Sequence, residues 1–275
     1  MASDDAVFTV SDTEEDTESN TDVEIITDVD DTEDETEHSM SAPRMMNMDN
    51  DSRDDFIEVF SPSRIVPHVR RRGMRASISM DIKYGNNFLM FEDRVAAFAT
   101  IATRKPLMVS ICPPCTMYSP LQRMWNLPHM SEETKTERFK ESDTLLEFAM
   151  VLAKVQYQGG RFFVFEHPER ASSWKNKKVE VVASWPLVRK VTFDQCRVGL
   201  QAPISKRPMR KRTTLMTNSV HIYNEFKDLK CMCADSHAVV QGAEYGISLA
   251  THAAIYPPRM CDMIAGAVEA HVMDQ

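Results

Sequence analysis

The stretch PLMVSICPPC, residues 106–115, is an apolar run of strand length that ends in two prolines and a cysteine. Proline fixes φ and lacks a backbone N–H, so Pro113 and Pro114 end the strand and hold the next residue on a stiff turn. A second strand is predicted at residues 161–165, and an amphipathic helix is predicted between the two, over residues 132–156. A strand, a long helix and a strand in this order predict two parallel strands in one sheet.

The same alternation continues toward the N-terminus. Apolar runs at residues 56–60 and 76–80 predict two further strands. Residues 64–72 and 92–104 predict helices, with Pro67 in the first turn of the earlier one. The sequence therefore predicts an α/β fold with a Rossmann-like, doubly wound, mostly parallel sheet. Ligands bind beyond the carboxyl ends of the strands in such sheets. Four polar or reactive side chains fall at these ends, namely Ser61, Asp81, Cys115 and Glu166.

Charge divides the chain into two parts. Residues 1–55 hold 20 Asp and Glu against two Arg, while residues 56–275 hold 30 Lys and Arg against 21 Asp and Glu, which gives net charges of −18 and +9. Residues 1–55 also contain a single aromatic side chain, so they cannot bury enough apolar surface to offset chain entropy. We therefore predict a disordered acidic N-terminal tail and one α/β domain over residues 56–275. The basic domain suits a nucleic acid, although an ordinary solvated surface carries the same residue types.

The sequence also predicts the compartment. It contains no apolar run of about 18 residues, the length needed to span a bilayer. The first ten residues lack the basic and apolar regions of a signal peptide. The six cysteines are scattered, as expected for reduced thiols. These features predict an intracellular protein, nuclear or cytoplasmic, that is neither secreted nor membrane-bound. The basic run at residues 206–212 fits a nuclear-import signal.

Cys115 and Glu166 are the residues best suited to chemistry. A thiol on a stiff turn after a strand acts as a nucleophile when its pKa is lowered. A carboxyl group at the end of the neighbouring strand is well placed to hydrogen-bond or protonate a group attached to that cysteine. An ordinary buried thiol at position 115 is the alternative interpretation.

Three motifs resemble those of the cytosine-C5 methyltransferases: a Pro-Pro-Cys turn with a serine four residues later, a glutamate after a hydrophobic strand, and an Arg-x-Arg ahead of an apolar strand. His167-Pro168 stand where the family has Asn-Val, and Pro208 stands where it has Gln. The match spans roughly residues 56–216 in family order, and the matched positions are Pro113, Pro114, Cys115, Ser119, Glu166, Arg210 and Arg212. The resemblance implies the class I methyltransferase fold.

The activity that this resemblance implies is S-adenosylmethionine-dependent methyl transfer to C5 of cytosine in DNA, with single-stranded DNA or RNA as alternative substrates. Cys115 would attack C6 of a base taken out of the stack, and Glu166 would engage N3. Arg212 and Arg210 would contact the base or its phosphate. Ser119 would contact the substrate.

The cofactor half of the resemblance is less complete. The family's Phe-x-Gly-x-Gly turn corresponds to residues 60–64, Phe-Ser-Pro-Ser-Arg, where both glycines are absent. An acidic residue follows the second strand, as in the family, where it binds the ribose hydroxyls. The resemblance therefore implies that S-adenosylmethionine would contact Phe60, Ser61, Asp81 and Pro114.

A second function also fits the sequence. The missing glycines and the short segment that could serve as a reduced target-recognition region, residues 213–250, fit a catalytically inactive nucleic-acid-binding or assembly protein. Ala-Ser-Ser-Trp at residues 171–174 and Phe-Asp-Gln-Cys at residues 193–196 resemble looser relatives in viruses and mobile elements. Tyr256-Pro257-Pro258 is a weaker echo of the family near the end of the chain.

A metal site is a further alternative. Cys112 and Cys115 have the spacing of a metal or redox pair. The segment Cys231-x-Cys233-x-x-x-His237 offers three zinc ligands, with His221 or Cys261 as a fourth. One-residue spacing between cysteines suits a compact tetrahedral site poorly, so the sequence predicts no metal. The remaining cysteine and the tryptophans are predicted to be packing residues, and these are Cys196, Trp125, Trp174 and Trp185.

Overall fold

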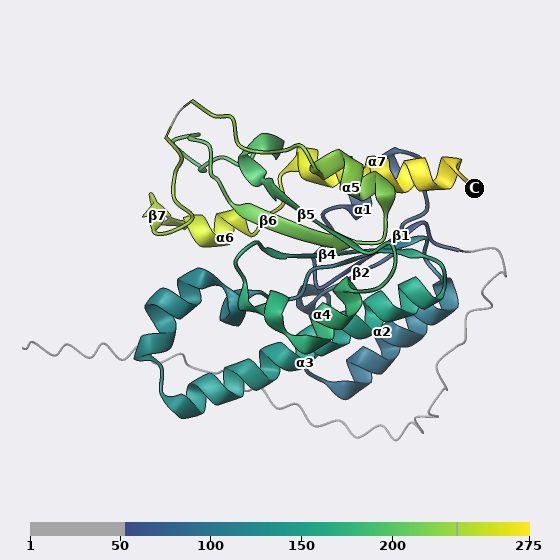
Figure 1. Cartoon of the computed structure of the whole chain (residues 1–275), viewed down its shortest axis with the longest axis horizontal. Coiled ribbons are helices and arrows are strands. Elements are labelled where there is room, and N and C mark those ends of the chain that lie inside the picture. Colours follow the sequence, from purple (N-terminus) through teal and green to yellow (C-terminus); the bar gives the residue numbers. More distant parts are fainter. Residues whose placement is uncertain (1–52, 235) are drawn as a thin grey trace, which may run out of the picture. The chain divides into compact units, whose positions relative to one another are not determined.

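A six-stranded sheet lies between two layers of helices (Figure 1). The computed structural model describes residues 53–234 and 236–275. β1 to β4 run parallel, whereas β6 is antiparallel to both of its neighbours. The predicted α/β fold with a mostly parallel sheet is therefore confirmed. The strands, in their order across the sheet, are β2 (Ser79–Met80), β1 (Phe56–Val59), β3 (Met108–Ile111), β4 (Phe162–Pro168), β6 (Arg212–Thr217) and β5 (Arg189–Asp194).

The chain crosses to the other side of β1 after β2. β2 pairs with one edge of β1, and β3 pairs with the opposite edge. An α/β sheet binds ligands at such a switch point, outside the carboxyl ends of its strands. The residues that follow β1, β2 and β3 therefore meet at the edge where a ligand is expected.

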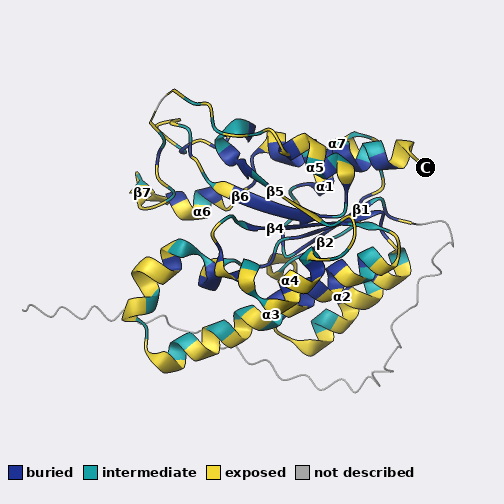
Figure 2. Ribbon diagram, in the orientation of Figure 1, coloured by how far each residue is buried: buried dark blue, intermediate teal, exposed yellow. Residues whose placement is uncertain are grey.

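Helices cover both faces of the sheet. One face packs against α1 (Val66–Arg71), α5 (Val220–Phe226) and α7 (Pro258–Met273). The other packs against α2 (Phe91–Arg104), α3 (Glu132–Gln158) and α4 (Lys177–Ala183). In Figure 2 the strands and the sheet-facing sides of these helices are buried, while their outer sides are exposed. The sheet thus separates two hydrophobic cores, as expected of a three-layer α/β domain.

The long helix α3 begins and ends where its sequence indicates. The Ser131 hydroxyl caps it by accepting a hydrogen bond from the Thr134 N–H, and Glu132 and Glu133 occupy the first turn, where the helix dipole favours acidic side chains. After the helix, Gly160 adopts φ 65°, which lets the chain turn into β4. The predicted helix is confirmed and is two residues longer than predicted at its C-terminal end.

β4 is longer than the predicted strand. Residues 166–168, which were predicted to follow the strand, belong to it. β3 stops opposite Phe165, but β6 pairs with residues 164–168, so β6 alone holds the last three residues. Glu166 therefore lies inside β4, one residue beyond the last β3–β4 pair.

A small lobe, built from residues 199–209, 229–234 and 236–253, adjoins β5 and β6. It contains the hairpin of β7 (Ala243–Glu244) and β8 (Ile247–Ser248), followed by α6 (Leu249–Ala253). Residues 213–226 of the predicted recognition region form β6 and α5 in the main domain, so only residues 227–250 are left outside the sheet layers. The core of the small lobe consists of Leu200, Ala202, Met209, Ala238, Leu249 and Ala253.

The N-terminal boundary of the domain precedes residue 56. The predicted acidic tail, residues 1–55, lies outside the described residues except for residues 53–55. Asp54 is buried, and its Oδ2 lies 3.1 Å from Nη1 of Arg104. Within the described ranges, no helix is both long and apolar enough to cross a membrane.

Candidate active site

The strand ends bring the predicted site residues to one edge of the sheet. β1 and β3 end in register, and their last residues, Val59 and Ile111, lie level with Phe165 of β4. β2 ends in register with β1, which adds the residue after β2 to the same edge. The residues that follow these positions are Phe60, Asp81, Cys112 and Glu166, and the Pro113-Pro114-Cys115 turn continues from them.

Glu166 presents a carboxylate oxygen without a hydrogen-bond partner. The residue is 8% exposed, and the Tyr256 hydroxyl donates to Oε2 at 3.0 Å. Oε1 is buried and accepts no hydrogen bond from any described residue, although Nζ of Lys211 lies 4.0 Å away. Leaving a buried charged acceptor unpaired costs free energy, so Oε1 is suited to receive a donor from a ligand.

Cys115 begins the short turn after the two prolines. Its backbone has φ −96° and ψ 5°, in the sparsely populated region where many active-site residues are found. Burial and the nearby Glu166 carboxylate together raise the pKa of its thiol to about 11, and Lys211 opposes the shift. In the free protein the thiol therefore keeps its proton at neutral pH. Any nucleophilic role requires a group that takes this proton as the substrate binds.

His167 ties the Pro-Pro-Cys turn to β4. Its ring is fully buried, with Nε2 3.2 Å from the Pro113 carbonyl oxygen and Nδ1 2.6 Å from the Ser173 hydroxyl. The carbonyl can only accept, so Nε2 carries the proton and Nδ1 accepts from Ser173. This role leaves no signal in the local sequence, because His167 contacts a carbonyl 54 residues earlier in the chain.

The Ala-Ser-Ser-Trp segment supports the same strand end. Ser173 fixes the His167 ring, and Nε1 of Trp174 donates to the Pro168 carbonyl at 2.7 Å. Trp174 is partly buried and its ring packs edge-on against Phe165. Its predicted packing role is therefore confirmed, and the segment has a structural reason to accompany the Glu-His-Pro sequence.

Acid should destabilise the protein partly through His167. Burial lowers the pKa of its imidazole to about 3, whereas the unfolded chain binds a proton near its ordinary value of about 6.5. The stability that neutral His167 contributes is therefore present above about pH 6.5 and is lost as the pH falls, by about 1.4 kcal/mol per pH unit. We expect His167→Gln to lower the free energy of unfolding at pH 7 and to flatten its decline between about pH 6 and pH 4.

Urea unfolding at several pH values measures this difference. His271, whose pKa burial lowers to about 4, titrates in the same window in both proteins, so it does not affect the comparison between them. Equal pH slopes for the wild type and the variant would contradict the prediction.

The turn after β1 is held by a buried carboxylate. Glu58 lies inside β1 with no exposed surface. Its Oε2 accepts hydrogen bonds from the backbone N–H groups of residues 64, 65 and 66 at 3.0, 2.9 and 2.9 Å. Its Oε1 accepts from the Ser61 hydroxyl at 3.2 Å. Burial raises the pKa of Glu58, and these backbone donors oppose the shift. The Glu58 carboxylate thus occupies the backbone N–H groups that a glycine-rich turn would present to an anionic ligand.

The remaining cofactor residues fit a nucleoside. Phe60 takes φ 62°, a left-handed conformation that is strained for a residue other than glycine, and its ring packs against Phe88 at 4.8 Å. Asp81 Oδ1 accepts from the Lys83 N–H at 3.0 Å, while Oδ2 has no hydrogen bond to the described residues. Asp81 can therefore accept from ribose hydroxyls, and the exposed Pro114 borders the same edge.

The Arg-x-Arg segment places a different cation at the site. Arg212 lies against two carboxylates, with Nη1 3.5 Å from Glu169 and Nε 3.4 Å from Asp194. Arg210 is exposed at the edge of the small lobe. Lys211, between them, is the cation that approaches Glu166. In the sequence, the position of Lys211 inside the basic run at residues 206–212 was the only indication that it could lie at the site.

The segment after Cys115 presents an aromatic side chain to solvent. The Ser119 hydroxyl accepts a hydrogen bond from the Gln122 N–H at 3.1 Å, so it caps the next helical turn. Trp125, in that turn, is 54% exposed. The prediction that Trp125 is a packing residue is therefore wrong, because residues 123–126 of this turn are exposed. Trp185, in contrast, packs partly buried against Tyr157.

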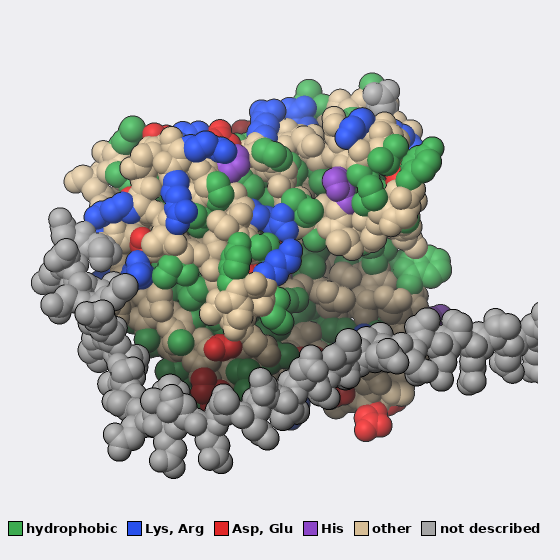
Figure 3. Space-filling model, turned by 180° about the vertical axis from the view of Figure 1, so that it is seen from behind, with side chains coloured by type: hydrophobic (Ala, Val, Ile, Leu, Met, Phe, Trp, Pro, Cys, Tyr) green, Lys and Arg blue, Asp and Glu red, His purple; other side chains and the backbone are tan. Residues whose placement is uncertain are grey.

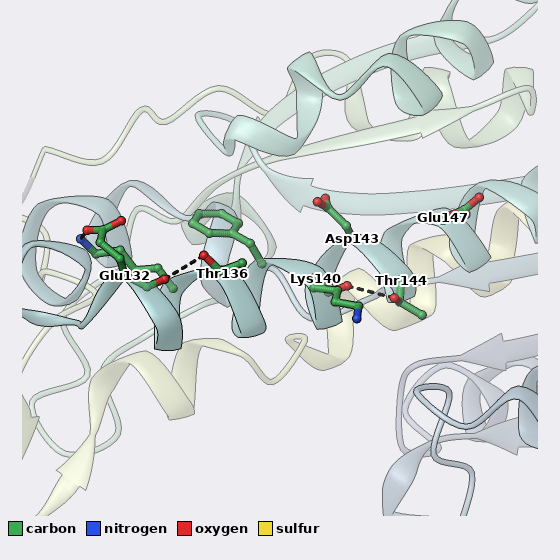
Figure 4. A pocket seen from close by; sticks show the side chains of 8 residues that line it. Glu132, Thr136, Lys140, Asp143, Thr144 and Glu147 are labelled. Atoms are coloured by element: carbon green, nitrogen blue, oxygen red, sulfur yellow. Dashed lines mark hydrogen bonds and ion pairs between the residues drawn. The ribbon is translucent and has the colours of Figure 1, made fainter.

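Surface charge is unevenly distributed. Lys and Arg side chains are spread over the upper part of the face shown in Figure 3, with fewer acidic side chains among them. A separate hollow of about 620 Å³ runs along α3 (Figure 4). All its lining residues belong to α3, and the Thr136 and Thr144 hydroxyls donate to carbonyls of their own helix. We therefore assign no site to that hollow.

Comparison with known proteins gives no relative from which a function could be transferred. No protein-family model matches the chain, and no curated protein matches it. The function is therefore inferred from the side chains at the sheet edge.

Proposed function

We propose that the protein transfers a methyl group from S-adenosylmethionine to C5 of cytosine in a nucleic acid, with DNA as the favoured substrate. The observation that carries this proposal is the unpaired Oε1 of Glu166, buried close to the Cys115 thiol. A cytosine offers donors at its exocyclic amine and at protonated N3, and Oε1 can accept from them. The class I methyltransferase fold is part of the proposal, and the switch point between β1 and β3 supports it.

The proposed chemistry begins with Cys115 and Glu166. Glu166 accepts the proton of Cys115 and passes it to N3, while a bond forms between Sγ and C6. This addition makes C5 nucleophilic, and S-adenosylmethionine, when bound, would supply the electrophilic methyl group and leave as S-adenosylhomocysteine. Loss of the C5 proton to water then breaks the Sγ–C6 bond, and Glu166 returns the N3 proton to Sγ, which restores the thiol. Lys211 limits the negative charge around the reacting groups, and His167 positions the turn that carries Cys115.

The surface around the edge supports a nucleic-acid substrate. Trp125 follows Cys115 closely in the chain and offers an exposed ring on which an unpaired base can stack. Arg210 is exposed and is available to a phosphate. The net charge of +9 over residues 56–275 favours a polyanion. DNA recognised in this way would have its target base outside the stack.

Methyl transfer from labelled S-adenosylmethionine to cytosine-containing DNA tests the proposal. We expect the wild type to label DNA and Cys115→Ser to lose at least about 10³-fold in rate, because the nucleophile is gone. The control is Cys261→Ala, a buried cysteine of α7 outside the site, which should label DNA as the wild type does. Equal labelling by Cys115→Ser and the wild type would contradict the mechanism.

A nucleic-acid-binding protein without catalysis is the second candidate. The observation that favours it is the occupation of three backbone N–H groups at the start of α1 by Glu58. Those donors are not free for the charged end of a cofactor. Calorimetry with S-adenosylmethionine separates the two functions: micromolar binding would exclude the second candidate, while DNA binding without cofactor binding would support it.

A further inference from the structure

Four metal-ligand side chains converge between the main domain and the small lobe. Their Sγ and imidazole nitrogen atoms all lie within 4.8 Å of one another, and the residues are Cys196, Cys231, Cys233 and His237. All four are partly buried. Cys196 was predicted to be a core residue, and the sequence offered His221 or Cys261 as the fourth ligand of the alternative metal site. The structure brings Cys196 to the other three from a distant part of the chain.

The chain fixes each end of this cluster. Cys196 lies in the turn η6 (Gln195–Val198), which directly follows β5. Asp194, the last residue of β5, accepts the Cys231 N–H through Oδ2 at 2.9 Å. Nη2 of Arg207 donates to the His237 carbonyl at 3.2 Å. These contacts hold the backbone on both sides of the cluster, so its convergence does not depend on contacts among the four side chains alone.

The spacing of the ligand atoms matches a tetrahedral zinc site. With Zn–S bonds of about 2.3 Å and Zn–N bonds of about 2.0 Å, two ligand atoms of a tetrahedron lie about 3.5–3.8 Å apart. The Cys231 Sγ and the His237 Nε2 are 3.3 Å apart, and the whole set falls within 4.8 Å. Small adjustments of side-chain torsions would bring all four to bonding distance. Three thiolates and one imidazole are also a donor set that zinc prefers.

The small lobe has a physical need for such a site. Its core contains six buried side chains, three of which are alanines. An apolar cluster of this size contributes little stability, and small units of this kind are commonly held by a structural metal. The four ligands tie the lobe's segment at residues 231–237 to the end of β5. We propose that Cys196, Cys231, Cys233 and His237 bind one Zn²⁺ as a closed structural site that fixes the small lobe to the main domain.

The second group of ligand-type residues is explained without a metal. His221, His271 and Asp274 also lie close together. Nε2 of His271 is 2.6 Å from the Ser219 hydroxyl, which itself caps α5. Nε2 of His221 is 2.7 Å from Oδ2 of Asp274. Hydrogen bonds therefore already engage this group, and it provides a matched control for the zinc site.

Metal analysis of the full-length protein, expressed in zinc-supplemented medium, tests this inference. We expect one zinc per chain in the wild type, retention of that zinc in Asp274→Asn, and its loss in Cys196→Ala and His237→Ala. Replacement by Co²⁺ should give the visible absorption of a tetrahedral ion together with thiolate-to-cobalt charge transfer. A strong chelator should lower the melting temperature of the wild type and of Asp274→Asn.

Three outcomes would overturn the proposal. The first is folded wild-type protein that binds neither metal under reducing conditions. The second is a disulfide between any two of the three cysteines in protein purified under reducing conditions. The third is loss of zinc from Asp274→Asn with zinc retained in Cys196→Ala. Where a cysteine variant fails to fold, the wild-type metal content, the cobalt spectrum and the chelator experiment still decide the result.

Discussion

Glu166→Gln should make the Cys115 thiol more reactive while it suppresses methyl transfer. The Glu166 carboxylate raises the pKa of this thiol, so its removal lowers that pKa and increases the thiolate fraction at a fixed pH near 8. For each unit by which the pKa falls, alkylation should accelerate about threefold, because the larger thiolate fraction is partly offset by lower nucleophilicity. Methyl transfer should fall about 10²–10⁴-fold, because glutamine cannot relay the proton to N3.

Site-resolved alkylation with iodoacetamide and methyl-transfer assays measure the two effects. Lys211→Met is the matched control, since Lys211 lowers the pKa of Cys115 and its loss should slow alkylation. We therefore expect opposite changes in alkylation rate for Glu166→Gln and Lys211→Met. Misfolding would instead expose the thiol and accelerate alkylation in both variants. Unchanged alkylation of Glu166→Gln would show that the carboxylate does not act on the thiol, and unchanged methyl transfer would remove Glu166 from the mechanism.

Glu58→Ala should cause the largest loss of stability of the variants considered. The substitution leaves three backbone N–H groups at the start of α1 without the acceptor that the fully buried Glu58 provides, and two of these three hydrogen bonds are themselves buried. Each buried donor that loses its partner costs about 1–3 kcal/mol, so we expect the free energy of unfolding to fall by about 3–5 kcal/mol. Urea unfolding at pH 7 measures it.

An exposed glutamate provides the comparison. Glu147 is 55% exposed on α3 and pairs with Lys178 at 2.5 Å, so Glu147→Ala should change the free energy of unfolding by less than about 1 kcal/mol. A loss below about 1 kcal/mol for Glu58→Ala would mean that water or a rearranged turn satisfies the three N–H groups. Such a rearrangement would also free these groups for a ligand, which calorimetry with S-adenosylmethionine would detect.

The parts of the fold that depend on local sequence could be predicted. Pro113 and Pro114 end β3 through their own geometry, and Ser131 caps α3 through its own hydroxyl. Predicting that the strand ends meet required only the rule that parallel strands finish at one edge. The extension of β4 through Pro168 could not be predicted, because it depends on pairing with β6, more than 40 residues later in the chain.

The site was predicted less well than the fold because its contacts are long-range. Lys211, rather than either flanking arginine, approaches Glu166, whereas Arg212 lies against Glu169 and Asp194. Tyr256 reaches Glu166 from the far end of the chain. Cys196 joins Cys231 only after the turn beyond β5 is placed beside the small lobe. Spacing within one motif carries no information about such pairs.

The position of β6 determines the order in which the domain can assemble. β4 and β5 come earlier in the chain, yet each pairs with β6 and not with the other. As the chain is synthesised, the edge of β4 that carries Glu166 therefore remains unpaired until residues 212–217 insert between the two waiting strands. Such late, non-local pairing slows folding and leaves hydrophobic strand edges open to other chains. Growth at low temperature or with chaperones, which limits association of these edges, should raise the yield of folded protein.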